Sequence, residues 1–222
     1  TKKVIIISNK YPRSLKKTDY LNGILVKRYN FFHSPLSYLK SVRLDLIFSW
    51  FFFKIYTLVE LFIFFTKVKP NVVNLHFPDH QIFEILFLKL FFKFKIITNL
   101  HGNEVERIKY VKRYGVKYFL YLTLFKESRY ILCCSKSLIN DVKTIFPKMR
   151  RDKLRVIYNG VSNTFLSKRL NLIKSNYIFS AMRFVPKKGL DLIIESISSL
   201  KLKNNIFIAG GNNRDAEKLL GY

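Results

Sequence analysis

The stretch Arg183-Phe184-Val185-Pro186-Lys187-Lys188-Gly189-Leu190-Asp191 joins an apolar, strand-like run at residues 176–181 to an amphipathic helix. Apolar side chains recur after it with the spacing of one buried helix face, at Leu190, Ile193, Ile194, Ile197 and Leu200. The free N–H groups and the dipole at the start of such a helix attract an anion, and Arg183 and Lys188 can pair with it. The segment therefore predicts a phosphate site, although a solvated connection has the same pattern.

Strand-like and helix-like segments alternate along the chain, which predicts an α/β fold with a parallel sheet covered by helices on both faces. A polar stretch at residues 162–176 divides them into two series and predicts domains over residues 1–165 and 166–222. The second domain has two strands, too few to cover its helices, so we expect it to be incomplete. The expected strands are 4–7, 72–77, 95–100, 130–134, 154–158, 177–182 and 205–209. The expected helices are 21–33, 44–66, 79–93, 105–127, 135–146 and 188–201, with a further helix start at 214–220.

Segments along the chain resemble, in order, the motifs of family 4 retaining glycosyltransferases, which have the GT-B fold of two Rossmann-like domains. Residues 183–189 resemble the R-x-V-P-x-K-G segment that opens the second domain of this family. Residues 98–104 (T-N-L-H-G-N-E) resemble its T-x-H-G-x-D/E motif. The other similar segments are 11–12 with 22–26 (a Gly-containing loop and first helix), 72–77, 134–138, 156–161 and 208–211.

His101 is the candidate catalytic residue. It follows the strand at residues 95–100, and open α/β sheets bind ligands at the carboxyl ends of their strands, although an ordinary loop histidine has the same spacing. The resemblance implies that His101 faces the interdomain cleft and contacts the transferred sugar or the acceptor. It also implies that Glu104 and Asn159 are cleft residues, although Asn159-Gly160 alone predicts only a turn.

The resemblance also implies a donor site formed by Gly23, Arg183 and Lys188. Gly23 would lie near the donor phosphates, although Asn22-Gly23 alone predicts a turn, and the two cations would bind the diphosphate and stabilise its growing charge. The chain departs from the family at Met182, where Gly is usual, and has no match to the E-x7-E glutamates that hold the donor. We therefore expect a truncated product or fragment whose nucleotide site is incomplete.

The chain is strongly basic, with 40 Lys and Arg against 14 Asp and Glu and a formal net charge of +26. This balance favours an anionic partner, but no zinc-finger spacing, RNP-type motif or basic zipper indicates nucleic acid. We therefore expect an anionic membrane surface, with the basic and aromatic residues 107–118 as an anchor or a solvated helix face. Residues 46–66 have the length of a spanning helix, but Lys54 and Glu60 near the middle favour a helix packed on the sheet or lying on a membrane.

Neither a metal site nor a disulfide is expected. His76 and His80 have the spacing of metal ligands, but Pro78 interrupts it and no further Cys or His cluster completes a site. The resemblance likewise implies no divalent ion and no cofactor, since the nucleotide sugar is a substrate. Cys133 and Cys134 face opposite sides of a strand, so we expect free thiols, a reducing compartment and, without a secretory signal, a cytoplasmic location.

We therefore expect a retaining glycosyltransferase, or a piece of one, at the cytoplasmic face of a membrane. It would transfer a sugar from a nucleotide-diphosphate sugar to a lipid-linked or saccharide acceptor in surface polysaccharide or cell-wall synthesis. One alternative is a catalytically silent fragment that binds a membrane or a partner, which the missing glutamates favour. Another is a nucleotide-sugar epimerase of the same fold, although the His-Gly and Arg-x4-Lys-Gly segments resemble transferases more.

Overall fold

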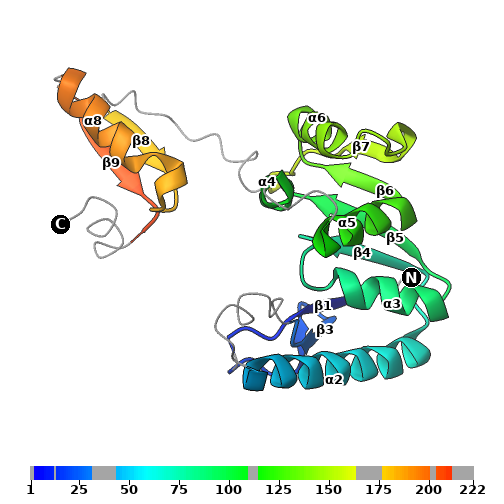
Figure 1. The fold of residues 1–222 in the computed structure, drawn as a ribbon. Coiled ribbons are helices and arrows are strands. Elements are labelled where there is room, and N and C mark those ends of the chain that lie inside the picture. Colours follow the sequence, from blue (N-terminus) through cyan, green and yellow to red (C-terminus); the bar gives the residue numbers. More distant parts are fainter. Residues whose placement is uncertain are drawn as a thin grey trace. The chain divides into compact units, whose positions relative to one another are not determined.

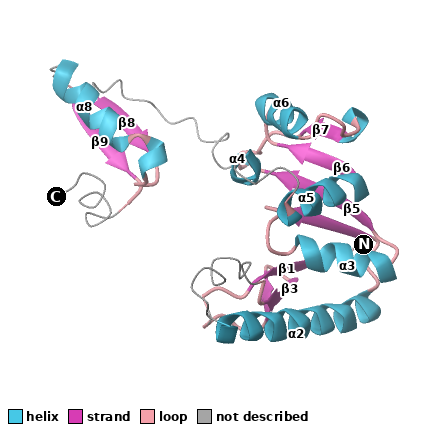
Figure 2. Ribbon diagram, in the orientation of Figure 1, coloured by secondary structure: helices cyan, strands magenta, loops and turns pink. Residues whose placement is uncertain are grey.

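The computed structural model describes residues 3–12, 14–31, 44–109, 115–163, 177–200 and 204–211. The chain divides into two compact units, Thr1–Gly160 and Val161–Tyr222, which we call unit 1 and unit 2. The domain boundary expected between residues 165 and 166 lies a few residues after this division. Figure 1 labels the elements of each unit, and Figure 2 colours them by type.

Unit 1 combines two small sheets with the helices that connect their strands. Its first elements are β1 (Ile5–Asn9), β2 (Thr18–Leu21), β3 (Ile24–Tyr29), α2 (Leu44–Val68), β4 (Val72–His76) and α3 (Ile82–Phe91). The later ones are β5 (Lys95–Leu100), α4 (Asn103–Lys109), α5 (Val116–Glu127), β6 (Ser128–Cys133), α6 (Lys136–Ile145), the short η1 (Arg151–Lys153) and β7 (Leu154–Val156).

The strands β4, β5, β6 and β7 form one parallel sheet in chain order, which we call sheet B. Helices separate its first three strands and precede η1 and β7, because a chain that pairs strands in parallel must return to the same end of the sheet each time. All four carboxyl ends therefore share one edge, the carboxyl edge, and all four amino ends share the opposite amino edge. This arrangement confirms the predicted parallel α/β sheet.

A second sheet, sheet A, has the order β1-β3-β2, with β1 parallel and β2 antiparallel to β3. Asn22 and Gly23 connect β2 to β3 with φ angles of 48° and 77°, the left-handed pair that a tight type I′ hairpin turn requires. The helix predicted over residues 21–33 is therefore wrong. The Asn-Gly pair starts a strand whose alternate residues Ile24 and Val26 are β-branched, and both features favour a hairpin over a helix.

The long helix predicted over residues 105–127 is also wrong, because two helices, α4 and α5, occupy this region. Gly115 precedes α5 with an extended backbone, which ends any continuous helix there. Helix α6 starts as predicted after Ser135, whose Oγ accepts a hydrogen bond from the Leu138 amide at 3.1 Å. Cys133 and Cys134 are free thiols, as predicted, and burial raises the pKa of Cys133 to about 12.

Helix α2 packs one side against the core of unit 1, where Thr57, Leu61 and Phe65 are buried. Its central charges face the protein. Lys54 forms an ion pair with Glu84 of α3, with both side chains buried, and donates to the His80 carbonyl at 3.1 Å. Glu60 accepts from Lys17. The packed helix expected at residues 46–66 is therefore observed, although residues 47–68 are also long and apolar enough to cross a membrane.

Unit 2 contains β8 (Tyr177–Ala181), the short η2 (Pro186–Lys188), α8 (Leu190–Leu200) and β9 (Asn205–Ala209). The two strands pair in parallel, as predicted. Gly210 follows β9 against the 182–184 bend, where an added Cβ would lie 1.4 Å from the Met182 carbonyl oxygen, so no other residue fits. The helix start expected at residues 214–220 lies outside the described residues.

Candidate functional site

Two histidines meet at the carboxyl edge of sheet B. His76 ends β4 and His101 follows β5, so the parallel pairing of these strands places them side by side. Nδ1 of His76 lies 3.2 Å from Nε2 of His101, within hydrogen-bond distance. One ring must donate and the other accept, which gives the pair one shared proton when both rings are neutral. We call these two residues the histidine pair.

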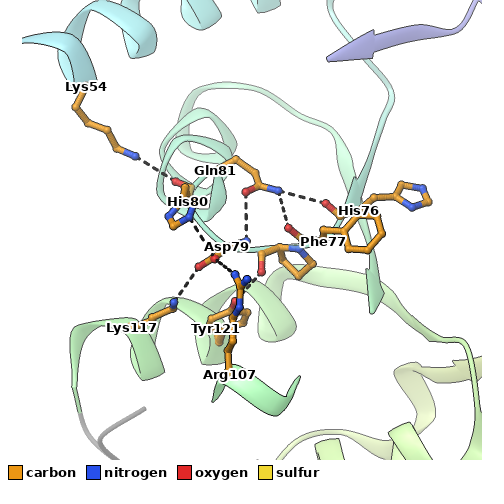
Figure 3. A network of polar contacts seen from close by, with 10 residues as sticks. Lys54, His76, Phe77, Asp79, His80, Gln81, Arg107, Lys117 and Tyr121 are labelled. Atoms are coloured by element: carbon orange, nitrogen blue, oxygen red, sulfur yellow. Dashed lines mark hydrogen bonds and ion pairs between the residues drawn. The ribbon is translucent and has the colours of Figure 1, made fainter. Parts of the chain in front are cut away.

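Phe77 fixes the plane of the His101 ring. The two rings are stacked with their centroids 4.1 Å apart and their planes 19° from parallel. Phe77 itself has a left-handed backbone with φ of 50°, an unusual conformation for a bulky residue. The Gln81 side chain holds this bend, because its amide donates to the carbonyls of His76 at 3.2 Å and Phe77 at 3.0 Å (Figure 3). Strained backbone of this kind often supports a functional site.

Glu104 positions the backbone of His101 through hydrogen bonds. Its Oε2 accepts hydrogen bonds from the amides of His101 at 3.1 Å and Gly102 at 3.0 Å, and the side chain is buried. Gly102 has φ of 116°, so the chain can turn sharply from the strand into α4. The buried carboxylate thus fixes the turn that presents the His101 ring. Nδ1 of His101 has no hydrogen-bond partner among the described residues.

Asp79 is the centre of a charged network next to the histidine pair (Figure 3). Its carboxylate pairs with Arg107 of α4 and Lys117 of α5, both at 2.9 Å, and with His80 at 3.3 Å. Burial alone would raise the pKa of Asp79, but the hydrogen bond from Lys117 and the surrounding positive charges lower it below its ordinary value. The network ties α4 and α5 to the loop after β4.

Burial also lowers the pKa of the His76 imidazole, and the adjacent His101 lowers it further. A positive charge on His76 would lose part of its solvation there, so the neutral form of this imidazole is favoured near pH 7. The His101 ring, held by stacking on Phe77 and by the Glu104 contact to its backbone, can exchange hydrogen bonds with hydroxyl groups. Burial raises the pKa of Tyr121, whose hydroxyl donates to the Pro78 carbonyl at 2.6 Å in the same loop.

The other predicted residues of unit 1 lie apart from this contact network. Gly23 occupies the hairpin turn of sheet A, with open space where a Cβ would stand. Asn159 is exposed and follows β7, so it lies beyond the same carboxyl edge as the histidine pair. Within the predicted set, contact is therefore shown between His101 and Glu104.

The other two predicted donor residues, Arg183 and Lys188, lie in unit 2. Arg183 is in the bend after β8, and Lys188 ends η2 just before α8, so one connection carries both exposed cations. Gly189 has φ of 68° and allows the chain to turn from η2 into α8. The Ile193 amide donates a hydrogen bond to the Gly189 carbonyl. The amides of residues 190–192 precede this bond and belong to the first turn of α8, whose amides have no acceptor within a helix.

The sequence reasoning missed three residues of this site. His76 was considered only as a metal ligand with His80, whereas it pairs with His101, and among the described residues no group of three His, Cys, Asp or Glu side chains can hold a metal ion. Phe77 and Asp79 were not singled out. The available signal was the position of all three at the end of β4 or within three residues after it, where functional side chains of a parallel sheet gather.

The comparisons with known proteins agree with this architecture. The family model of Glycosyltransferase Family 4 matches residues 3–165. The sucrose-phosphate synthase of Thermosynechococcus elongatus is among the solved structures with a similar fold, with a TM-score of 0.61 and 12% identity over 98% of this chain. This chain spans 62% of the length of that structure. The search of curated protein sequences found no match to this chain. Because the family model covers most of its length, the chain belongs to glycosyltransferase family 4, and its fold is GT-B.

Proposed function

We propose that this glycosyltransferase moves a sugar from a nucleotide-diphosphate sugar to a lipid-linked or saccharide acceptor, in surface polysaccharide or cell-wall synthesis, with retention of configuration. The bond between the anomeric carbon and the diphosphate breaks, a bond to an acceptor oxygen forms, and the acceptor hydroxyl loses its proton. The observation that carries the proposal is the geometry of His101. Its ring is stacked on Phe77 and paired with His76, and its Nδ1, at the carboxyl edge of the sheet, has no hydrogen-bond partner among the residues that the structure describes.

His101 would hydrogen-bond a hydroxyl of the transferred sugar or the acceptor through Nδ1. The His76 contact at Nε2 sets which ring nitrogens can donate, and Glu104 holds the backbone that carries the ring. An orientation fixed before the substrate arrives makes such a contact most effective in the transition state. We propose that Glu104 and Asn159 belong to the same cleft, Glu104 as a positioning residue.

The donor diphosphate would bind to Arg183 and Lys188 at the start of α8, with Gly23 near its phosphates. Two cations beside free helix amides suit a diphosphate, and its negative charge grows as it leaves. The cations therefore stabilise the departing group more than the bound donor. We propose that no metal ion or other cofactor takes part.

Release of nucleoside diphosphate from UDP-, GDP- and ADP-sugars, with lipid and saccharide acceptors supplied, tests the transfer. His101→Ala should lower release by roughly a hundredfold, the typical effect of one well-placed hydrogen-bonding group. Arg183→Gln and Lys188→Gln should each weaken donor binding by roughly tenfold, while the control Lys67→Gln, which removes an exposed cation of α2, should not. Binding without turnover would favour the silent fragment, and interconversion of donors without transfer would favour an epimerase. No binding of any nucleotide sugar would overturn the donor site.

We also propose that unit 1 lies on the anionic cytoplasmic face of a membrane through α2. The side of α2 away from the core exposes large apolar residues, and further ones on α3 are also exposed. Large apolar side chains exposed together on neighbouring turns of a helix are typical of membrane or partner contacts. The exposed members on α2 are Phe48, Phe51, Phe52, Phe53, Ile55, Tyr56, Val59, Ile63 and Val68, and those on α3 are Phe83, Leu90 and Phe91.

Vesicle flotation tests the membrane proposal. Phe51→Ser/Phe52→Ser should reduce binding to phosphatidylglycerol vesicles, while Ile157→Ser/Tyr158→Ser after β7, which removes apolar groups of similar exposure, should not. High salt should weaken binding by screening the basic surface, because the screening length is about 10 Å at 0.1 M. Equal effects of the two double variants would contradict a specific role for α2.

A further inference from the structure

The surface of unit 1 is hollowed at the amino edge of sheet B, and we call this hollow the amino-edge pocket. Its volume is about 440 Å³, within the range of small-molecule sites at ~300–1,000 Å³. The first residues of neighbouring strands form part of its wall, with Lys95 at the start of β5, Arg129 near the start of β6 and Arg155 near the start of β7. The parallel strands thus bring these cations to one edge.

The wall of the amino-edge pocket is far more basic than the chain. Six of its eleven lining residues are cations, whereas 40 of the 222 residues of the chain are Lys or Arg, so the general composition does not account for the enrichment. Two acids, Glu127 and Asp152, also line it. The six cations are Lys89, Lys95, Arg129, Arg150, Lys153 and Arg155.

Tyr130 gathers two of these cations. The guanidinium carbon of Arg129 lies 5.6 Å from the centre of its ring, and that of Arg155 lies 5.8 Å from it. Nη1 of Arg155 donates to the carbonyls of Asp152 at 2.8 Å and Leu154 at 2.9 Å, which fixes the guanidinium plane. Two like charges held around one ring repel each other, so a bound anion would relieve the repulsion.

The acids of the wall leave most of this charge unneutralised. Asp152 pairs with Arg150, with contacts at 3.1 Å and 2.6 Å. In the part of the chain that the structure describes, no carboxylate pairs with Lys95, Arg129 or Arg155. These three residues therefore offer charged donors to a ligand, and planar guanidinium groups match phosphate oxygens particularly well.

A second hollow of about 450 Å³ adjoins the first and shares Lys89, Phe94 and Lys95 with it. It adds Lys93 to the basic surface. The positive surface therefore continues along the amino edge, and a ligand with more than one phosphate group can contact both hollows at once.

The amino-edge pocket is remote from the histidine pair. Lys95 begins β5 and His101 follows its end, so at about 3.3 Å per residue the two positions are roughly 20 Å apart. Open α/β sheets bind their substrates at the carboxyl edge. A ligand at the amino edge therefore lies away from the transferred sugar.

We propose that the amino-edge pocket is a separate binding site for a ligand that carries a multiply charged phosphate group. The shared chemistry fits a free diphosphate or polyphosphate and equally the phosphate headgroup of a lipid. The inference rests on the pocket alone and does not require the proposed sugar transfer. Arg129, Arg155 and Lys95 bind the phosphate oxygens, and Lys93 extends the site toward a second phosphate.

Isothermal titration with inorganic pyrophosphate and with dihexanoylphosphatidic acid, a soluble short-chain lipid, tests the proposal. Pyrophosphate also fits the proposed donor site, so all measurements use the Arg183→Gln/Lys188→Gln background. Lys95→Gln/Arg129→Gln should raise the dissociation constant of the preferred ligand by at least roughly tenfold. Lys136→Gln/Lys143→Gln on α6 removes the same charge from outside the pocket and should change it less than about twofold.

Comparison of the two ligands distinguishes a free diphosphate from a lipid headgroup as the source of the phosphate. Tighter binding of pyrophosphate assigns a free diphosphate, and tighter binding of the lipid assigns a headgroup. Hydrogen exchange on the unsubstituted protein gives an independent measurement, because the ligand should slow exchange at residues 128–130 and 153–155. Equal losses in the two double variants, no protection in these segments, or no binding of either ligand would overturn the proposal.

Discussion

Nδ1 of His76 lies 3.2 Å from Nε2 of His101, although 25 residues separate them in the chain. The contact exists because β4 and β5 are parallel neighbours whose ends coincide. Partial burial and the adjacent His101 lower the pKa of His76, because both disfavour a positive charge on this ring. The lowered pKa favours the neutral form of His76 near neutral pH, and in the contact one ring donates and the other accepts.

This pair predicts a loss of stability on mild acidification. The unfolded chain binds a proton on His76 near pH 6.5, and the folded protein binds it at a lower pH because its pKa is lowered. The free energy of unfolding should therefore fall as the pH drops from 6.5 through the folded pKa, and His76→Asn should reduce this fall. Urea denaturation followed by the fluorescence of Trp50, the single tryptophan, measures it at several pH values. The prediction would be contradicted if the free energy of unfolding changed with pH in the same way in the unsubstituted protein and in His76→Asn.

Glu104 should stabilise the turn after β5 through its two backbone hydrogen bonds. Glu104→Ala leaves the amides of His101 and Gly102 without this acceptor, and we expect a loss of about 2–3 kcal/mol, since hydrogen bonds to a charged group contribute ~1.5–3 kcal/mol. Glu104→Gln keeps an acceptor oxygen and should lose less. Glu106→Ala, on the exposed side of the same helix, is the control and should stay within about 0.5 kcal/mol. A similar stability for Glu104→Ala and Glu106→Ala in urea would show that the carboxylate does not hold the turn.

The buried ion pair between Lys54 and Glu84 should be costly to break from one side. Lys54→Met leaves a buried carboxylate without its partner, and such changes destabilise by about 3–5 kcal/mol. The double variant Lys54→Met/Glu84→Leu should recover most of this loss, because neither charge remains. Thermal unfolding of both variants measures the difference.

The loss in Lys54→Met should also depend on pH. Burial raises the pKa of Glu84, so the folded protein takes up a proton there before the unfolded chain does. The destabilisation should be full at high pH and decrease as the pH falls through the folded pKa of this carboxyl. A loss independent of pH would mean that Glu84 remains ionised in the variant, against the effect of its burial.

Local patterns were sufficient to predict most strands and the position of His101. The run at residues 95–100 contains Ile96, Ile97 and Leu100 and ends before His101-Gly102, and the observed strand β5 has these same limits. Because parallel strands share a carboxyl edge, the place of His101 followed from the end of one strand. The charged network around Asp79 did not follow, since its partners Arg107 and Lys117 come from two later helices and meet it only in the folded chain.

The hairpin of sheet A shows where prediction from family resemblance failed. Asn22-Gly23 was identified as a turn from its own chemistry, but the resemblance to a loop and first helix led to a helix over the residues that follow. The structure has β3 there, paired with both β1 and β2. Local backbone chemistry was the better guide at this position, because both residues adopt positive φ at little cost and a helix has no place for them.

Gly23→Ala distinguishes a turn role from a donor-binding role for this residue. An alanine at φ of 77° is strained, and we expect the free energy of unfolding to fall by about 1–2 kcal/mol. Open space at the Cβ position means that strain, not a clash within the protein, causes the loss. Gly160→Ala also adds a methyl group in open space, without a positive φ, and should change stability by less than about 0.5 kcal/mol. Urea denaturation and nucleotide-sugar titration on the same samples separate the two roles. A weaker donor affinity at unchanged folded fraction would place the donor phosphates at this turn, and an unchanged affinity with the expected loss of stability would leave Gly23 as a hairpin residue alone.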